Sequence, residues 1–269
     1  MSRLLEALAS VAEVYDLAQP LSTETPHSPN HPPFRMSLMR RHGDMVREDG
    51  SSAANEMFVT GGHTGTHVDA LAHVSYKGKL YDDVSAEDAQ RGGRFKKHGV
   101  DTIEPVVCRG VLLDVAGLQG ADVLPGGYGI TEDDLAAAAE KAGVEVRLGD
   151  VVLVRSGWSR NFDDAAAFLG HESGVPGPTE EAARWLAERG VRATGAETIA
   201  YEQIKPEVGH ALLPVHRLLL VEHGIHIIEV MNLSEITLAG IYEFVFVLAP
   251  LKIVGGTGSP VRPLAVVDR

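Results

Sequence analysis

Apolar runs alternate with sharply bounded helical segments through the second half of this sequence. The runs RGVLLDVAG (109–117) and DVVLVRSGW (150–158) are nearly continuous in apolar residues, which is typical of buried strands. TEDDLAAAAEKAG (131–143) and PTEEAARWLAERG (178–190) open with a capping threonine or a proline, continue with acids and end at glycine, as helices do. This alternation predicts an α/β fold with a mixed sheet. The later elements expected are strands at 191–197 and 224–230, a helix at 211–223 and one or two strands within 241–256.

The first sixty residues predict less regular structure. Residues 2–12 carry an apolar stripe that suits a short helix, which must dock on its own domain or on a partner subunit. Residues 14–21 predict a strand. The following STETPHSPNHPPF (22–34) is too rich in proline, serine and threonine for regular structure, and long loops in compact domains are often functional. Further strands are expected at 36–47 and 56–61.

Length and composition narrow the class of protein. A chain of 269 residues suits one large domain or two small ones, and because no linker separates two parts we predict a single domain over residues 1–269. The net charge of −13 disfavours binding to nucleic acid or to anionic membranes. No apolar run is long enough to span a bilayer, and the N-terminus does not look like a signal peptide.

Cys108 is the only cysteine of the chain. An intrachain disulfide and a thiolate metal cluster are therefore both excluded, and a reducing cytoplasm is the expected location. Any bound metal must be held by imidazole and carboxylate groups.

Such groups are concentrated in the segment GGHTGTHVDALAH (61–73). His63, His67 and His73 fall within eleven residues of a chain that has 12 histidines, and Asp69 lies among them. In extended backbone His67 and Asp69 project to one side, and a tight turn with an unusual dihedral at Gly65 would bring His63 to the same side. Three ligands from imidazole and carboxylate leave positions open for water and substrate, as in catalytic sites. We therefore predict a metal site at His63, His67 and Asp69.

His73 is the candidate acid/base. A bound metal lowers the pKa of water towards neutrality, and a nearby histidine can move protons between that water and a leaving atom. The segment is not the zincin motif, because Thr64 stands where that motif needs glutamate.

The segment 63–73 also resembles the His-x-Gly-Thr-His-x-Asp-x-x-x-His motif of the bacterial cyclase-like family, which includes kynurenine formamidases and isatin hydrolases. YDLAQPLS (15–22) is similar to that family's opening strand. HRLLLVEHGIHIIEVMNLSEI (216–236) and APLKIVGGTGSPVRPLAVV (249–267) are similar to its late segments. The resemblance covers most of the chain. It implies a swivelling β/β/α fold, a divalent cofactor such as Mn²⁺ or Zn²⁺, and a homodimer or homotetramer.

The same resemblance assigns roles. His63, His67 and Asp69 match metal ligands and His73 matches the acid/base. His216 and Glu229 match late positions that help to bind a second metal in formamidase-type members, whereas in the isatin-hydrolase type the late histidine contacts substrate. This chain keeps Glu229, but its spacing from His216 is one residue longer than in the formamidase pattern. One or two metals per subunit are therefore expected.

The remaining candidates are weaker. His27 and His31 lie in the proline-rich loop and are interpreted as solvated, while Phe34 is a candidate for packing against substrate. His226 alternates with apolar neighbours and is expected to face outward; His210 and His223 are not expected to bind metal either. Trp158 is interpreted as core, no nucleophile elbow surrounds Ser156, and GGTGSP (255–260) is interpreted as a turn that lines the site.

The leading functional hypothesis is a metal-dependent hydrolase that acts on the C–N bond of a lactam, cyclic amide or arylformamide. A ring-closing cyclase or dehydratase in polyketide-type biosynthesis would use the same ligands. A non-catalytic small-molecule or metal-binding protein is the third hypothesis. The expected partner is a small-molecule substrate.

Overall fold

The structure, a computed structural model, describes residues 12–268. A nine-stranded mixed sheet, ordered β1-β13-β11-β5-β7-β9-β10-β4-β12, forms its centre. Strands β5, β7, β9 and β10 run parallel, and the pairs outside them are antiparallel. The strands of this sheet are β1 (Ala12–Asp16), β4 (His67–Asp69), β5 (Val106–Asp114), β7 (Val151–Arg155), β9 (Ala193–Ala196), β10 (His226–Glu229), β11 (Glu243–Leu248), β12 (Gly258–Pro260) and β13 (Leu264–Asp268). The predicted α/β class with a mixed sheet is confirmed.

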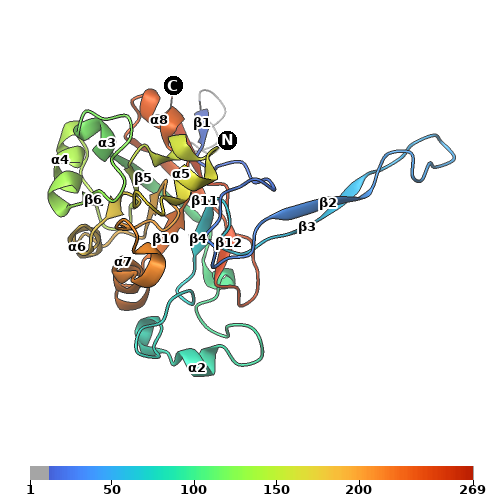
Figure 1. Cartoon of the computed structure of the whole chain (residues 1–269), viewed down its shortest axis with the longest axis horizontal. Helices are drawn as coiled ribbons and strands as arrows, with labels where there is room; N and C mark the ends of the chain where they lie inside the picture. The colour runs from blue at the N-terminus through green and yellow to red at the C-terminus, as the bar shows by residue number, and fades with distance from the viewer. Residues whose placement is uncertain (1–11, 269) are drawn as a thin grey trace, which may run out of the picture.

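Helices and two small ribbons complete the fold (Figure 1). The helices are α2 (Ala86–Ala89), α3 (Val115–Leu118), α4 (Glu132–Ala142), α5 (Ala165–Leu169), α6 (Glu180–Glu188), α7 (Pro214–His216) and α8 (Ser234–Leu238). Short 3-10 turns occupy Tyr81–Asp83, Val100–Thr102, Trp158–Asn161 and Gly209–Ala211, and a π-helical turn, Arg217–Glu222, continues α7. The ribbons pair β2 (Arg35–Arg40) with β3 (Asn55–Val59) and β6 (Gly129–Ile130) with β8 (Gly177–Pro178). Among the described residues, no helix has the length and apolar character needed to cross a bilayer.

The two main helices form where the sequence predicts them. Thr131 caps α4: its hydroxyl accepts from the Asp134 N–H at 3.2 Å, and the Asp134 carboxylate accepts from the Thr131 N–H at 3.0 Å. This capping box satisfies backbone donors that the first turn leaves free. Gly143 ends the helix with a φ of +68°, which glycine adopts without a Cβ penalty. The Thr179 hydroxyl caps α6 in the same manner.

The central strands β5 and β7 are buried on both faces, which explains why their sequences are nearly continuous in apolar residues. On β5, Val111 and Leu113 pack towards α4 and α6, while Leu112 points to the opposite face of the sheet. On β7, Val152 and Val154 share the first core and Leu153 the second. Burial on both faces makes this part of the sheet a rigid platform, and β10 and β4 extend the platform towards the histidine-rich segment.

Several predicted boundaries shift for local reasons. The strand expected over 109–117 ends at Asp114, because the Asp114 carboxylate accepts the Gly117 N–H and starts α3. The strand expected over 14–21 ends at Asp16, after which the chain crosses to bridge Ala18 with Met231. Residues 241–256 form one strand, β11, followed by a loop. The helix expected over 2–12 lies outside the described residues, except for Ala12, where β1 begins.

Candidate metal centre

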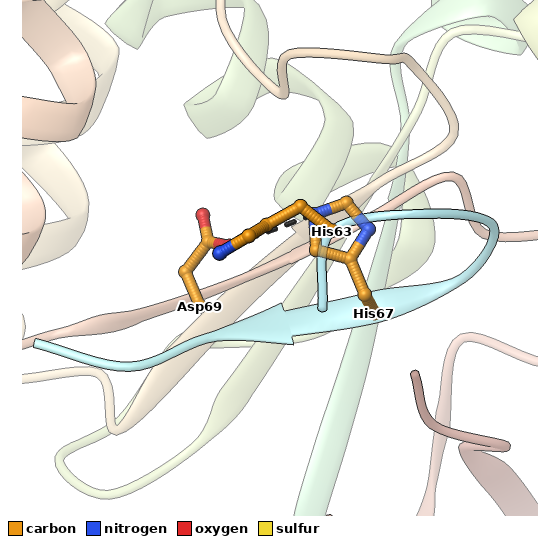
Figure 2. Close-up of side chains that lie close together, drawn as sticks. All are labelled: His63, His67 and Asp69. Atoms are coloured by element: carbon orange, nitrogen blue, oxygen red, sulfur yellow. Dashed lines mark hydrogen bonds and ion pairs between the residues drawn. The ribbon is translucent and has the colours of Figure 1, made fainter. Parts of the chain in front are cut away.

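The predicted ligands gather where a tight turn enters β4. His67 and Asp69 are two residues apart on this strand and project to one side, and His63 reaches the same place from the turn before it (Figure 2). Gly65 makes the turn possible: its φ is +69°, and a Cβ there would lie 2.9 Å from Leu21 Cδ1. The geometry expected from the spacing is confirmed.

Two overlapping sets of possible metal ligands share Asp69, and we call them the two donor sets. In the first, His63 Nδ1 lies 2.7 Å and His67 Nε2 lies 3.5 Å from Asp69 Oδ1. In the second, His216 Nε2 lies 3.6 Å from Asp69 Oδ2 and 3.1 Å from Glu229 Oε1. Within each set the donor atoms lie within 4.8 Å of one another, and all five residues are buried. The structure therefore brings His216 and Glu229 to the predicted site and gives each oxygen of Asp69 a separate set.

The fold explains how the late residues arrive. Glu229 ends β10, which pairs antiparallel with β4 so that Glu229 stands opposite His67. His216 is the last residue of α7, a short helix that begins at Pro214. A 13-residue separation in sequence thus becomes direct contact, with His216 Nε2 3.1 Å from Glu229 Oε1.

The donor set fits a divalent ion. Asp69 Oδ2 is buried and has no hydrogen-bond partner within residues 12–268, which is costly for a carboxylate oxygen unless a cation faces it. The His67 Nδ1–H donates to the Gly65 carbonyl at 2.8 Å, which leaves the Nε2 lone pair directed at the cluster. Imidazole and carboxylate without thiolate suit zinc or manganese.

The protonation states of Asp69 and His67 also favour a cation, whereas burial of Glu229 acts the other way. Burial alone would raise the pKa of Asp69, but the imidazoles of His73, His63 and His67 outweigh it and lower that pKa, so the group is a carboxylate. Burial lowers the pKa of His67, which keeps it a neutral ligand. Burial raises the pKa of Glu229, and the adjacent His216 opposes this only in part.

Glu202 belongs to the site, although no motif in the sequence indicates it. Its carboxylate accepts from His216 Nδ1 at 2.8 Å and from the backbone N–H groups of Val215 and His216 at 3.1 and 2.9 Å. Burial acts against the charged form of His216, but its bonds to Glu202 and Glu229 outweigh burial and raise its pKa well above the ordinary value. Glu202 therefore fixes the orientation of His216 and directs Nε2 towards Asp69.

Replacing Glu202 by Gln should loosen His216. The amide keeps the shape but loses the negative charge, and such partners of metal-bound histidines typically contribute about 10–100-fold to metal affinity or activity. We expect a loss of that size in metal affinity, measured by competition with a chelator. Glu207→Gln, an exposed change nearby, is the matched control. Unchanged affinity in a folded Glu202→Gln protein would contradict this role.

His73 lies beside the donor sets without joining them. Its ring stacks on His63 with centroids 3.8 Å apart, and it faces the His216 ring at 6.3 Å. No group in the described chain makes a hydrogen bond to its imidazole. Burial lowers the pKa of His73 to about 3, so the ring is neutral near pH 7.

His31 corrects the prediction of a solvated loop histidine. Its ring centroid lies 5.0 Å from His63 and 6.0 Å from His73, and burial together with His63 lowers its pKa. The loop carries His31 inward because the Thr64 hydroxyl donates to the Pro32 carbonyl at 2.8 Å, which pins the loop to the turn before β4. His27, also partly buried, has its Nδ1 3.4 Å from the Thr25 carbonyl and makes no contact with the donor sets.

The other late histidines stay outside the donor sets. His226 does not face freely outward: its Nδ1–H donates to the Asp69 carbonyl at 2.9 Å, so it supports the strand that carries the ligand. The prediction missed this because the half-buried ring bonds to the backbone of β4, the neighbouring strand in the sheet, which comes from a distant part of the sequence. His223 is exposed, and His210 Nδ1 lies 3.4 Å from the Ser28 hydroxyl.

The predictions for Trp158, residues 255–260 and Phe34 have different outcomes. Trp158 is buried in a core cluster and its Nε1–H donates to the Phe168 carbonyl, as the core interpretation predicts. Residues 255–260 line the site, because the Thr257 hydroxyl lies 2.9 Å from His63 Nε2, but the last three of them form strand β12 and not a turn. Phe34 is buried and stacks on Phe58 with centroids 6.0 Å apart, and its contact with substrate remains a prediction.

Comparison with known proteins places this fold and site in a family. The Cyclase family model matches residues 15–203. The chain is 30% identical to an isatin hydrolase of Roseibium aggregatum, over 97% of this chain and 94% of that protein. It is 27% identical to a kynurenine formamidase of Bacillus cytotoxicus, over 94% and 97%. A crystal structure described as a novel cyclase superposes with a TM-score of 0.84 at 29% identity, covering 98% of this chain and 92% of that one. The chain belongs to the Cyclase family.

Proposed function

We propose that this chain is a metal-dependent hydrolase that cleaves the C–N bond of a small amide, either a lactam or another cyclic amide, or an arylformamide. The observation that carries the proposal is the buried Asp69, whose oxygens face two sets of metal-type donors. The similarity to isatin hydrolase and kynurenine formamidase supports the reaction class. An aromatic amide fits both of these relatives.

We further propose two divalent ions, zinc or manganese. His63, His67 and Asp69 would hold one, and Asp69, His216 and Glu229 the other. The separation of the Asp69 oxygens between His63 and His216 supports a shared carboxylate. Such ions lower the pKa of water and polarise a carbonyl group.

The residues of the chain supply the remaining chemistry. A ring nitrogen of His73, neutral and free of hydrogen bonds within the described chain, takes a proton from the attacking water and returns it to the departing nitrogen. Glu202 holds His216, and the pinned loop holds His31 beside His63, where it can contact the substrate. The buried surroundings strengthen each of these electrostatic contacts.

Isotope uptake distinguishes hydrolysis from ring closure. In H₂¹⁸O, hydrolysis of a lactam or an N-formyl arylamine adds one solvent oxygen to the product carboxylate and frees an amine. A cyclase or dehydratase would give a product lighter than its substrate by one water. We expect ¹⁸O in the carboxylate by mass spectrometry. Water loss would support the cyclase alternative, and binding without turnover across both amide classes would support a non-catalytic role.

Location and partners are proposed on simpler grounds. A single cysteine, Cys108, suits a reducing cytoplasm. The net charge of −13 favours a small-molecule substrate over nucleic acid or an anionic membrane surface.

A further inference from the structure

The hydroxyl of Thr66 lies beside the metal centre but belongs to neither donor set. Thr66 is buried and directly precedes His67, the first residue of β4. Its hydroxyl oxygen accepts the backbone N–H of Gln19 at 2.8 Å, and the hydroxyl donates to the backbone carbonyl of Val230 at 2.6 Å. Because the N–H of Gln19 can only donate, the hydrogen of the hydroxyl is directed at Val230. One side chain thus joins segments that lie 47 and 164 residues away in the sequence.

Val230 has a backbone conformation that is unusual for its residue type. Its φ is +56°, in the left-handed region. Side chains with a branched Cβ are rarely found there, and such a conformation persists only where the surroundings hold it. Val230 is fully buried, its N–H donates to the Thr198 carbonyl at 3.1 Å, and its carbonyl accepts from Thr66. We call these two hydrogen bonds the Val230 clamp.

The Val230 clamp lies next to a predicted metal ligand. Glu229 is the last residue of β10, and its carboxylate contacts two histidines. Oε1 lies 3.1 Å from His216 Nε2, and Oε2 lies 3.4 Å from His67 Nε2. A rotation of the peptide between Glu229 and Val230 would carry the carboxylate away from one histidine or the other. The clamp, which fixes this peptide, therefore sets the direction of Glu229.

His67 is held by bonds that do not use the Thr66 hydroxyl. The Thr66 carbonyl accepts the Val261 N–H at 2.9 Å, which anchors the backbone before His67. The His67 Nδ1–H donates to the Gly65 carbonyl at 2.8 Å, and β4 pairs with a strand on each side. Loss of the hydroxyl should therefore release Val230 and leave His67 in place.

We propose that Thr66 is a positioning residue, which orients Glu229 through the Val230 clamp and so completes the second donor set. This inference deepens the proposed function and rests on the second ion proposed there. A hydroxyl with a purely structural role would contribute to folding stability alone. A positioning hydroxyl also changes the affinity of the ion held by Asp69, His216 and Glu229, and leaves the affinity of the other ion unchanged.

Zinc titration of the metal-free chain, in competition with a chelator, tests the proposal. Thr66→Val keeps the shape of the side chain and leaves the Val230 carbonyl unpaired. We expect one of two Zn²⁺ ions to bind more weakly by about 10-fold or more, since groups that orient metal ligands typically contribute about 10–100-fold. Thr66→Ser keeps the hydroxyl and should bind both ions as the wild type does. Thr64→Val removes the buried hydroxyl that donates to Pro32 and should also keep both ions, as the matched control.

The Glu229→Gln chain separates an effect through Glu229 from an effect through His67. Only the first donor set is intact there, so the addition of Thr66→Val should change the affinity of the remaining ion by no more than about 2-fold, as for independent sites. A larger loss would overturn the proposal, because Thr66 would then act on His67. Wild-type affinity for both ions in Thr66→Val, or a Thr66→Ser chain as impaired as Thr66→Val, would overturn it as well.

A metal-free measurement distinguishes failure of this proposal from failure of the proposed function. The ring nitrogens of His216 should shift in ¹⁵N NMR spectra of metal-free Thr66→Val and return in Thr66→Ser, because Glu229 Oε1 contacts Nε2. If Thr66→Val does not fold, Thr66→Ala leaves room for a water molecule beside the freed backbone groups and should give the same shift. An unchanged His216 spectrum in the folded variant would overturn the positioning role. A wild-type chain that binds one ion would contradict the proposed second metal, and the NMR result would still decide the role of Thr66.

Discussion

Asp69→Asn should remove both metal ions and with them the hydrolytic activity. Each oxygen of Asp69 faces a different donor set, at 2.7 Å from His63 Nδ1 and 3.6 Å from His216 Nε2. The amide is neutral, and its nitrogen would present donors where the sets need an acceptor. Because loss of a mere supporting partner already costs about 10–100-fold, we expect more than about 100-fold loss of activity. Elemental analysis of the purified chain gives the metal content directly.

Glu229→Gln is the informative comparison for Asp69→Asn. It changes a ligand of the second set and leaves every ligand of the first set in place, with the contact of Glu229 Oε2 to His67 Nε2, at 3.4 Å, as the one link between them. It should therefore leave about one ion per chain, held by His63, His67 and Asp69. Loss of metal in Asp69→Asn with one ion retained in Glu229→Gln would identify Asp69 as the shared ligand. An Asp69→Asn protein that keeps two ions would contradict that role.

His73→Ala should reduce turnover without removing metal. The His73 ring stacks on His63 but belongs to neither donor set, so its loss leaves the ligands in place. Removal of a positioned general acid/base typically costs about 10²–10⁴-fold in rate, and we expect kcat to fall by that factor. Steady-state kinetics and metal analysis on the same preparation provide the measurement.

Two outcomes would reassign His73. A variant with normal kcat would show that another group moves the proton. His31 is a candidate for that group, because its ring lies 5.0 Å from the ring of His63. A variant that loses its metal would show that His73 supports the ligands instead. His31→Ala is therefore the matched comparison, and we expect it to raise KM more than it lowers kcat.

Local patterns in the sequence were sufficient to predict the centre of the site. The two-residue period of a strand placed His67 and Asp69 together, and Gly65 allowed the turn that adds His63. The N-cap of α4 at Thr131 likewise depends on neighbours in sequence, and it was correctly predicted. Each of these features is fixed by contacts within a few residues.

The parts that failed depend on distant pairing. His31 was interpreted as solvated because nothing in its loop reveals the Thr64–Pro32 hydrogen bond that turns it inward. Glu202 lies 14 residues from His216, and only the packing of α7 makes it a partner. The strands expected at 36–47 and 56–61 form in part, as β2 and β3, but alternation alone could not show that they pair only with each other and not with the main sheet.

The most direct test of the account is a metal titration of the metal-free wild-type chain, with bound metal and amide hydrolysis measured in the same samples. The account predicts no hydrolysis at zero metal and a rate that rises with the ions bound by the two donor sets that share Asp69. Full hydrolysis by a chain verified to be free of metal would contradict it.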